Sequence, residues 1–173
     1  MLEKIQKFRE YLDYIERHYL NVQKAWKLIQ EKCKDKGFTW LKNPMMWFDI
    51  DHDVTYHDQS KLSVAEFTQY RQKCFPVEGE LVNDKAYLSA WEHHKLNNTH
   101  HWQNWTQRSD LDTDERRDRF VVMMLVDWVA MSFEFGDTAK QYYEKNREKI
   151  ELPDWAVQVM YDIFDCLYPE SNS

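Results

Sequence analysis

Glycine and proline are scarce in this chain of 173 residues, which contains three glycines and four prolines. Glycine supplies the positive backbone angles of tight turns and of phosphate-binding loops, and proline interrupts helices. Their scarcity therefore argues against Gly-rich nucleotide loops, β-meanders and flexible linkers, and it favours long helices. No P-loop motif occurs.

Cysteine is also scarce, and its positions are Cys33, Cys74 and Cys166. The three are odd in number, far apart and without a CxxC pair, so they argue against a disulfide framework or a zinc ribbon and indicate reduced thiols in a cytoplasmic protein. The longest apolar run, residues 120–131, is too short to span a bilayer and is interrupted by Asp127. The first twenty residues are charged throughout, unlike a secretory signal. We therefore expect a cytoplasmic protein without a membrane partner.

The residues that are abundant predict one helical domain. Hydrophobic residues make up 43% of the chain and aromatic residues 16%, which is enough for a single core over residues 1–169 with a frayed tail at 170–173. Apolar residues recur every three or four positions from Leu2 to Ile29, which predicts a long amphipathic helix that ends at about residues 34–37, with Gly37 as its C-cap. Further helical segments follow, so we expect an all-α fold of about six to eight helices.

Charge limits the partners. A net charge of −7 and a pI near 5.5 argue against binding to extended nucleic acid or to an anionic membrane. A small phosphorylated molecule remains compatible, because a metal ion or a few local cations would suffice to bind it. The sequence leaves the oligomeric state open.

The motif HDQSK, residues 57–61, contains the first candidate site. Adjacent side chains point about 100° apart on a helix, so His57 and Asp58 converge on one metal ion only if the backbone bends there or the ion lies at the helix rim. Lys61 lies one helical turn further on, where its ammonium would meet an anion bound to that ion. The alternative is a solvent-exposed HD dipeptide without a function. Residues 63–66 then read as a capping box, which predicts a helix start at Ser63.

Two single residues on apolar helix faces are further candidates. His18 lies on the apolar stripe of the first helix, and Asp127 is the only polar residue in the run 120–131. A buried carboxylate must be paired, protonated or bound to a cation, because leaving it unpaired costs several kcal/mol. The alternatives are a hydrogen-bonded structural histidine and a carboxylate that accepts from a Trp or Arg.

Four histidines cluster within nine residues, at positions 93, 94, 100 and 101. The positions of His94, Asn98 and His101 share one helix face, and His93 and His100 lie on the adjacent one. The Asn-Asn-Thr stretch at 97–99 is expected to break the helix, with Asn98 or Thr99 capping a second, short one. A solvated histidine patch is the alternative to a ligand cluster.

In chain order the candidates read H…HD…D, with HDxxK in the middle and a histidine cluster before the last Asp. This pattern resembles the HD-domain superfamily of metal-dependent phosphohydrolases. The extra histidines are similar to those of its dinuclear members, which include cyclic-dinucleotide phosphodiesterases and diiron oxygenases. More closely, HDQSK, AWEHHKLNNTHHW and DWVAMS resemble a family of bacterial and phage proteins that is described only as a domain of unknown function. That likeness covers residues 18–143.

The resemblance implies an HD-domain-like bundle and a set of metal ligands. His18, His57, Asp58 and Asp127 would surround a first ion. Asp58 would bridge to a second ion held by His94 and His101, with His93, His100 and Asn98 as alternate or neighbouring groups, and Lys61 would meet a phosphate oxygen. Imidazole and carboxylate ligands suit Mn, Fe, Co, Ni or Zn, as one ion or two.

The resemblance also implies hydrolysis of a phosphate ester in a nucleotide-like small molecule by a metal-activated water, with Asp58 and Lys61 in the catalytic machinery. Gln59 replaces the aliphatic residue common after HD, the GYP signature is absent, and Thr99 stands where the closer family often has Pro. These departures leave the substrate open. A diiron oxygenase on the same scaffold and a non-catalytic metal- or nucleotide-binding protein of phage-associated function are the alternatives.

Overall fold

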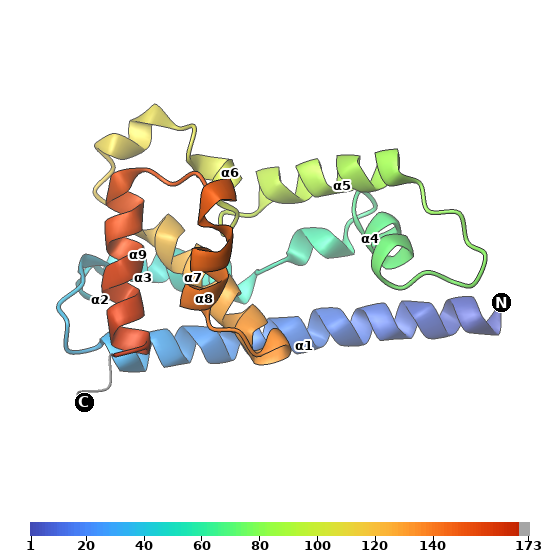
Figure 1. The fold of residues 1–173 in the computed structure, drawn as a ribbon, viewed down its shortest axis with the longest axis horizontal. Helices are drawn as coiled ribbons and strands as arrows, with labels where there is room; N and C mark the ends of the chain where they lie inside the picture. Colours follow the sequence, from blue (N-terminus) through green and yellow to red (C-terminus); the bar gives the residue numbers. More distant parts are fainter. Residues whose placement is uncertain (170–173) are drawn as a thin grey trace.

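The computed structural model describes residues 1–169, and in this range the fold is all-α, without strands (Figure 1). The predicted fold class is confirmed. The α-helices are α1 (Leu2–Cys33), α2 (Thr39–Lys42), α3 (Pro44–Thr55), α4 (Phe67–Cys74), α5 (Asp84–Asn97), α6 (Trp102–Trp105), α7 (Asp118–Phe135), α8 (Ala139–Asn146) and α9 (Asp154–Leu167). Single-turn 3-10 segments occupy Gln59–Leu62, Ser109–Asp112 and Arg147–Lys149. The expected frayed tail, 170–173, lies outside the described residues.

Helix α1 runs along the whole length of the molecule (Figure 1). It forms because its apolar residues recur every three to four positions, which places one stripe against the other helices. The helix ends at Cys33 with Lys34 as its C-cap, so the prediction that Gly37 is the C-cap is wrong. Gly37 takes the left-handed backbone conformation (φ +75°) in the connection that follows.

The larger of two cores surrounds the C-terminal half of α1. Helix α7 packs between α1, α3 and α9, and most of its residues from Phe120 to Ala130 are buried. A helix that is apolar on nearly all sides is stable only inside a fold, so α7 serves as the central element here. Asp127 is thereby held in the middle of the protein, beside α1.

A smaller core lies along the N-terminal half of α1, between this helix and the α4 and α5 segments (Figure 1). Tyr11, Tyr70 and Ala90 are its buried members. The loop between α4 and α5 is fixed by Glu80, which accepts two hydrogen bonds from the fully buried Arg71. His18 lies on α1 between the two cores, so the candidate site forms where they meet.

The predicted capping box at 63–66 is wrong. Helix α4 begins only at Phe67, after a turn, and the Ser63 hydroxyl is buried without a hydrogen-bond partner among the described residues. Glu66 is fully buried and turns its carboxylate toward the histidines of α5 instead of toward the helix start. The imidazole of His94 is buried and needs an acceptor inside the fold, and this contact holds the Glu66 carboxylate away from the helix start.

Among the described residues, no helix is both long and apolar enough to cross a membrane.

Candidate metal centre

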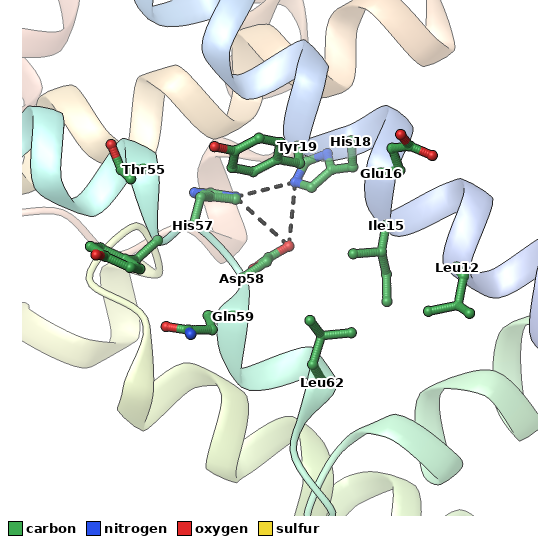
Figure 2. A pocket seen from close by; sticks show the side chains of 11 residues that line it. Leu12, Ile15, Glu16, His18, Tyr19, Thr55, His57, Asp58, Gln59 and Leu62 are labelled. Atoms are coloured by element: carbon green, nitrogen blue, oxygen red, sulfur yellow. Dashed lines mark hydrogen bonds and ion pairs between the residues drawn. The ribbon is translucent and has the colours of Figure 1, made fainter.

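One group of polar side chains converges from α1, from α7 and from the segment that follows α3. The Nε2 atom of His18 lies 3.2 Å from Nε2 of His57 and 3.2 Å from Oδ1 of Asp127. The Oδ2 atom of Asp58 lies 3.4 Å from His18 Nε2 and 3.7 Å from His57 Nε2. Figure 2 shows His18, His57 and Asp58 pointing toward one another. The structure therefore brings together all four residues expected around a first ion.

A bend in the backbone makes this convergence geometrically feasible. Helix α3 ends at Thr55, and Asp58 then takes a left-handed conformation with φ 59° before the 3-10 segment begins. A non-glycine residue in this conformation costs about 1–2 kcal/mol. The bend turns the side chains of His57 and Asp58, which would diverge on a helix, toward one point.

The second group comes from the end of α5 and the turn that follows it. Nε2 of His94 and Nε2 of His100 lie 3.3 Å and 3.4 Å from Oδ1 of Asp58. The ring centres of His94 and His101 are 4.8 Å apart, and those of His100 and His101 are 4.3 Å apart. The helix break predicted at 97–99 is confirmed, although His101 and not Asn98 or Thr99 precedes α6. The break places His100 beside Asp58.

These buried groups could hold metal ions. Among residues 1–169, three sets offer one ligand atom from each residue with all atoms within 4.8 Å of one another: His18, His57 and Asp127; His57, Asp58 and His100; and His94, His100 and His101. Asp58 Oδ1 and His101 Nε2 are buried and make no hydrogen bond within the described residues. A buried acceptor without a donor costs about 1–3 kcal/mol, which a cation at this position would offset. The donor set fits divalent transition metals.

The protonation states of His100, His101 and Asp58 are compatible with a role as metal ligands. Burial, and then the nearby His57, hold the pKa of His100 well below its usual range, and burial with the charge of His94 lowers the pKa of His101 to about 4. Both imidazoles are therefore neutral near pH 7, with a lone pair free for a ligand bond. Burial disfavours ionisation of Asp58, but the charges of Lys61 and His57 and the contacts with the neighbouring imidazoles together outweigh it, and the pKa of Asp58 falls well below its usual range.

Glu66 is a member of the site that the sequence analysis missed. Its Oε2 lies 2.8 Å from Nδ1 of His94, and its Oε1 lies 2.7 Å from Nδ1 of His93. A carboxylate that accepts from one ring nitrogen fixes the tautomer and leaves Nε2 free, here facing Asp58. The only sequence signal was the position of Glu66 beside the HDQSK motif, and the capping-box interpretation obscured it.

Two of the proposed alternate ligands lie outside the convergent group. The His93 side chain is 40% exposed and contacts Glu66, not Asp58 or Asp127. Asn98 donates through Nδ2 to the hydroxyl of Ser60 at 2.8 Å and to the carbonyl of His94 at 2.7 Å, so it supports the end of α5. His100, expected only as an alternate ligand, belongs to the convergent group, since its Nε2 lies 3.4 Å from Asp58 Oδ1.

Lys61 is buried and faces Asp58. Its Nζ lies 2.5 Å from Asp58 Oδ2, and its ammonium lies 5.7 Å and 5.8 Å from the ring centres of Tyr14 and Tyr70. It lines none of the three cavities that reach the histidines. In this arrangement Lys61 neutralises the carboxylate that lies between the two groups.

Cavities formed by the described residues reach the convergent groups from different sides, and three of them are large enough to consider as ligand sites. The α1 cavity, about 430 Å³, reaches His18, His57 and Asp58 past an apolar wall of Leu12, Ile15 and Leu62 (Figure 2). A second cavity, about 410 Å³, is lined by Trp91, Trp102 and Trp128 and is called the tryptophan cavity below; it reaches His100, His101 and Asp127. A third, also about 430 Å³, reaches His57 and His100 from the α3 side. No Lys or Arg is among the residues that line them.

Comparison with known proteins gives a family and no activity. Neither a curated protein nor a solved structure matches the chain. Residues 7–166 match a family described as "Family of unknown function (DUF5662)". This range includes every residue of the convergent groups, and the chain belongs to this family of unknown function.

Proposed function

We propose that this protein is a metal-dependent phosphohydrolase with two ions bridged by Asp58. The observation that carries the proposal is the placement of the Asp58 carboxylate, whose Oδ2 faces His18 and whose Oδ1 faces His94. A carboxylate with a separate imidazole group at each oxygen is suited to bridge two cations. The resemblance of the H…HD…D pattern to the HD-domain superfamily supports the same assignment.

The chain's residues have distinct roles in this proposal. His18, His57 and Asp127 would hold the first ion, while His94, His100 and His101 would supply ligands for the second. Such ions lower the pKa of a bound water and withdraw charge from a phosphoryl oxygen. Lys61 stabilises the ionised Asp58, and Glu66 orients His94. Asp127 has a 17% exposed side chain that opens toward the tryptophan cavity, so substrate approaches from that side.

The proposed substrate is a small phosphate ester, and the HD resemblance favours a nucleotide-like one. Because no Lys or Arg lines these three cavities, the ions themselves would supply most of the positive charge for the phosphoryl group. The free cysteines support a reducing, cytoplasmic location. The acidic net charge favours neither extended nucleic acid nor a membrane as a partner.

A panel of phosphomonoesters and phosphodiesters, assayed with added Mn²⁺, tests the proposal. Wild type is expected to release phosphate or a monoester from at least one substrate, and Asp58→Asn to lose about 100-fold or more of that rate, because the bridge is removed. Asp165→Asn, a change at an exposed aspartate of α9 that lines none of the three cavities, serves as the matched control. Equal inactivity of wild type and Asp58→Asn, together with tight nucleotide binding, would instead indicate a non-catalytic binding protein.

A diiron oxygenase is the second candidate, and the lack of Lys and Arg around the cavities favours it. A substrate without several negative charges would need no Lys or Arg in the walls of the cavity. Histidine and carboxylate ligands suit iron as well as manganese. Iron that copurifies with the protein, together with substrate-dependent oxygen uptake, would favour the oxygenase over the hydrolase.

A further inference from the structure

The tryptophan cavity has walls of an unusual kind for a phosphate-ester site. Three tryptophans, Trp91, Trp102 and Trp128, line it together with Tyr142 and Phe135. Trp102 directly follows His101, Trp128 directly follows Asp127, and Trp91 precedes His94 by three positions. The three tryptophans therefore belong to the same segments as His94, His101 and Asp127, which fixes their positions relative to these candidate ligands.

The aromatic surface is accessible to a ligand. Phe135 is 72% exposed and Tyr142 is 44% exposed. The rings of Trp128 and Tyr142 meet edge to face, with centroids 5.1 Å apart, and so form a corner of the cavity. Because rings in such a corner offer their faces to the cavity in different directions, the corner suits a rounded group better than a flat one.

The charged groups around the cavity are acidic. Asp137 lines it, is exposed, and has no ion-pair partner among the described residues, and Asp127 lies at the inner end. None of the residues around it is Lys or Arg. Aromatic faces attract cations through their ring quadrupoles, and clustered aromatic walls are the usual receptor for alkylated ammonium groups. An anionic group at the outer end would meet Asp137 without compensation.

We propose that the tryptophan cavity binds an alkylated ammonium group of the substrate, whose phosphoryl group lies at His100, His101 and Asp127. The placement of the phosphoryl group at these three residues rests on the proposed function. The substrate class is then the phosphate ester of an amino alcohol, with the organic cation in place of a nucleobase. In its hydrolysis, water forms the new P–O bond, the P–O bond to the alcohol breaks, and a proton from water passes to the alcohol oxygen.

Choline and its neutral isostere 3,3-dimethylbutan-1-ol separate charge recognition from simple apolar binding. Titration calorimetry on the full chain, with and without Mn²⁺, is expected to show choline binding at least about tenfold tighter than the isostere. Tyr142→Leu and Asp137→Asn should each weaken choline binding at least about threefold. Trp47→Leu, a change at an exposed tryptophan outside the cavity, should leave it unchanged. Circular dichroism checks the fold of each variant. If Tyr142→Leu is unfolded, Asp137→Asn still tests the prediction, because Asp137 is exposed and its replacement should leave the fold intact.

Equal binding of choline and the isostere, or no binding of choline, would overturn this inference. The hydrolysis of phosphocholine, adenosine 5′-monophosphate and glycerol phosphate completes the test. Preference for phosphocholine supports both proposals, and preference for the nucleotide overturns the ammonium site while the phosphohydrolase stands. Selective choline binding without hydrolysis of any ester would overturn the phosphohydrolase and leave the organic-cation site.

Discussion

Glu66 holds His94 by a hydrogen bond of 2.8 Å between its Oε2 and the ring Nδ1. We predict that Glu66→Gln weakens the binding of the second ion about 10- to 100-fold, because an amide orients and polarises the imidazole less than a carboxylate does. The first ion, held by His18, His57 and Asp127, should keep its affinity. Metal titration with a competing chelator measures both constants.

The control for this variant is Glu92→Gln, which changes an exposed carboxylate on the same helix as His94. Unchanged affinity for both ions in Glu66→Gln would show that Glu66 has only a structural role.

Lys61 separates two interpretations of the HDxxK motif. We predict that Lys61→Met destabilises the metal-free protein by about 2–4 kcal/mol, because Asp58 loses the cation that compensates its buried charge. Added Mn²⁺ should restore part of that stability, since an ion compensates the same carboxylate. Urea denaturation with and without Mn²⁺ measures the effect.

Lys73→Met, at a surface ion pair on α4, is the matched control and should change stability by less than about 0.5 kcal/mol. If Lys61→Met raised only the KM for a phosphate ester and left metal-free stability intact, Lys61 would be a phosphate ligand.

His57 tests whether the ions are needed for folding. His57 is one of the residues proposed to hold the first ion, so His57→Ala should abolish the binding of that ion. The helical circular dichroism should persist, because the packing of α7 against α1, α3 and α9 supplies most of the stability. A loss of helical signal in this variant would instead assign the ions a structural role.

The Arg71 and Glu80 pair gives a pH-dependent prediction outside the site. The hydrogen bond from Arg71 lowers the pKa of Glu80 to about 2, from an ordinary value of 4.5. Because the folded-state pKa lies below the unfolded one, the stabilisation is complete above pH 4.5 and is lost as the pH falls toward 2. Glu80→Gln should cost about 2 kcal/mol at pH 7, since Arg71 stays buried without its counter-charge.

Thermal or urea unfolding between pH 3 and pH 7 measures this difference. The gap between wild type and Glu80→Gln should narrow as the pH falls below 4.5. A gap that stays constant over this range would contradict the assignment of Glu80 as the titrating partner.

The sequence predicted the elements that have a periodic signal. His18 on the apolar stripe of α1 and Asp127 in the apolar helix α7 were found because each is a polar residue in an apolar pattern. The all-α class followed from the same periodicity. His57 and Asp58 were recognised as a motif, although only the left-handed backbone at Asp58 explains how the two meet.

Residues whose role depends on irregular backbone could not be assigned from the sequence. The turn at 98–101 decides which histidines face Asp58, and helix geometry alone placed His93 and His100 on one face. Glu66 satisfied a local capping rule, but tertiary contacts with two imidazoles determine its position. A long-range hydrogen bond leaves no periodic trace in the sequence, whereas a helix does.

The central claim is that two ions flank the carboxylate of Asp58. Anomalous scattering from a crystal grown with Mn²⁺ tests it most directly. The account predicts two peaks, one near His18, His57 and Asp127 and one near His94, with His93 away from both. A single peak, or none, between α1 and α5 would contradict it.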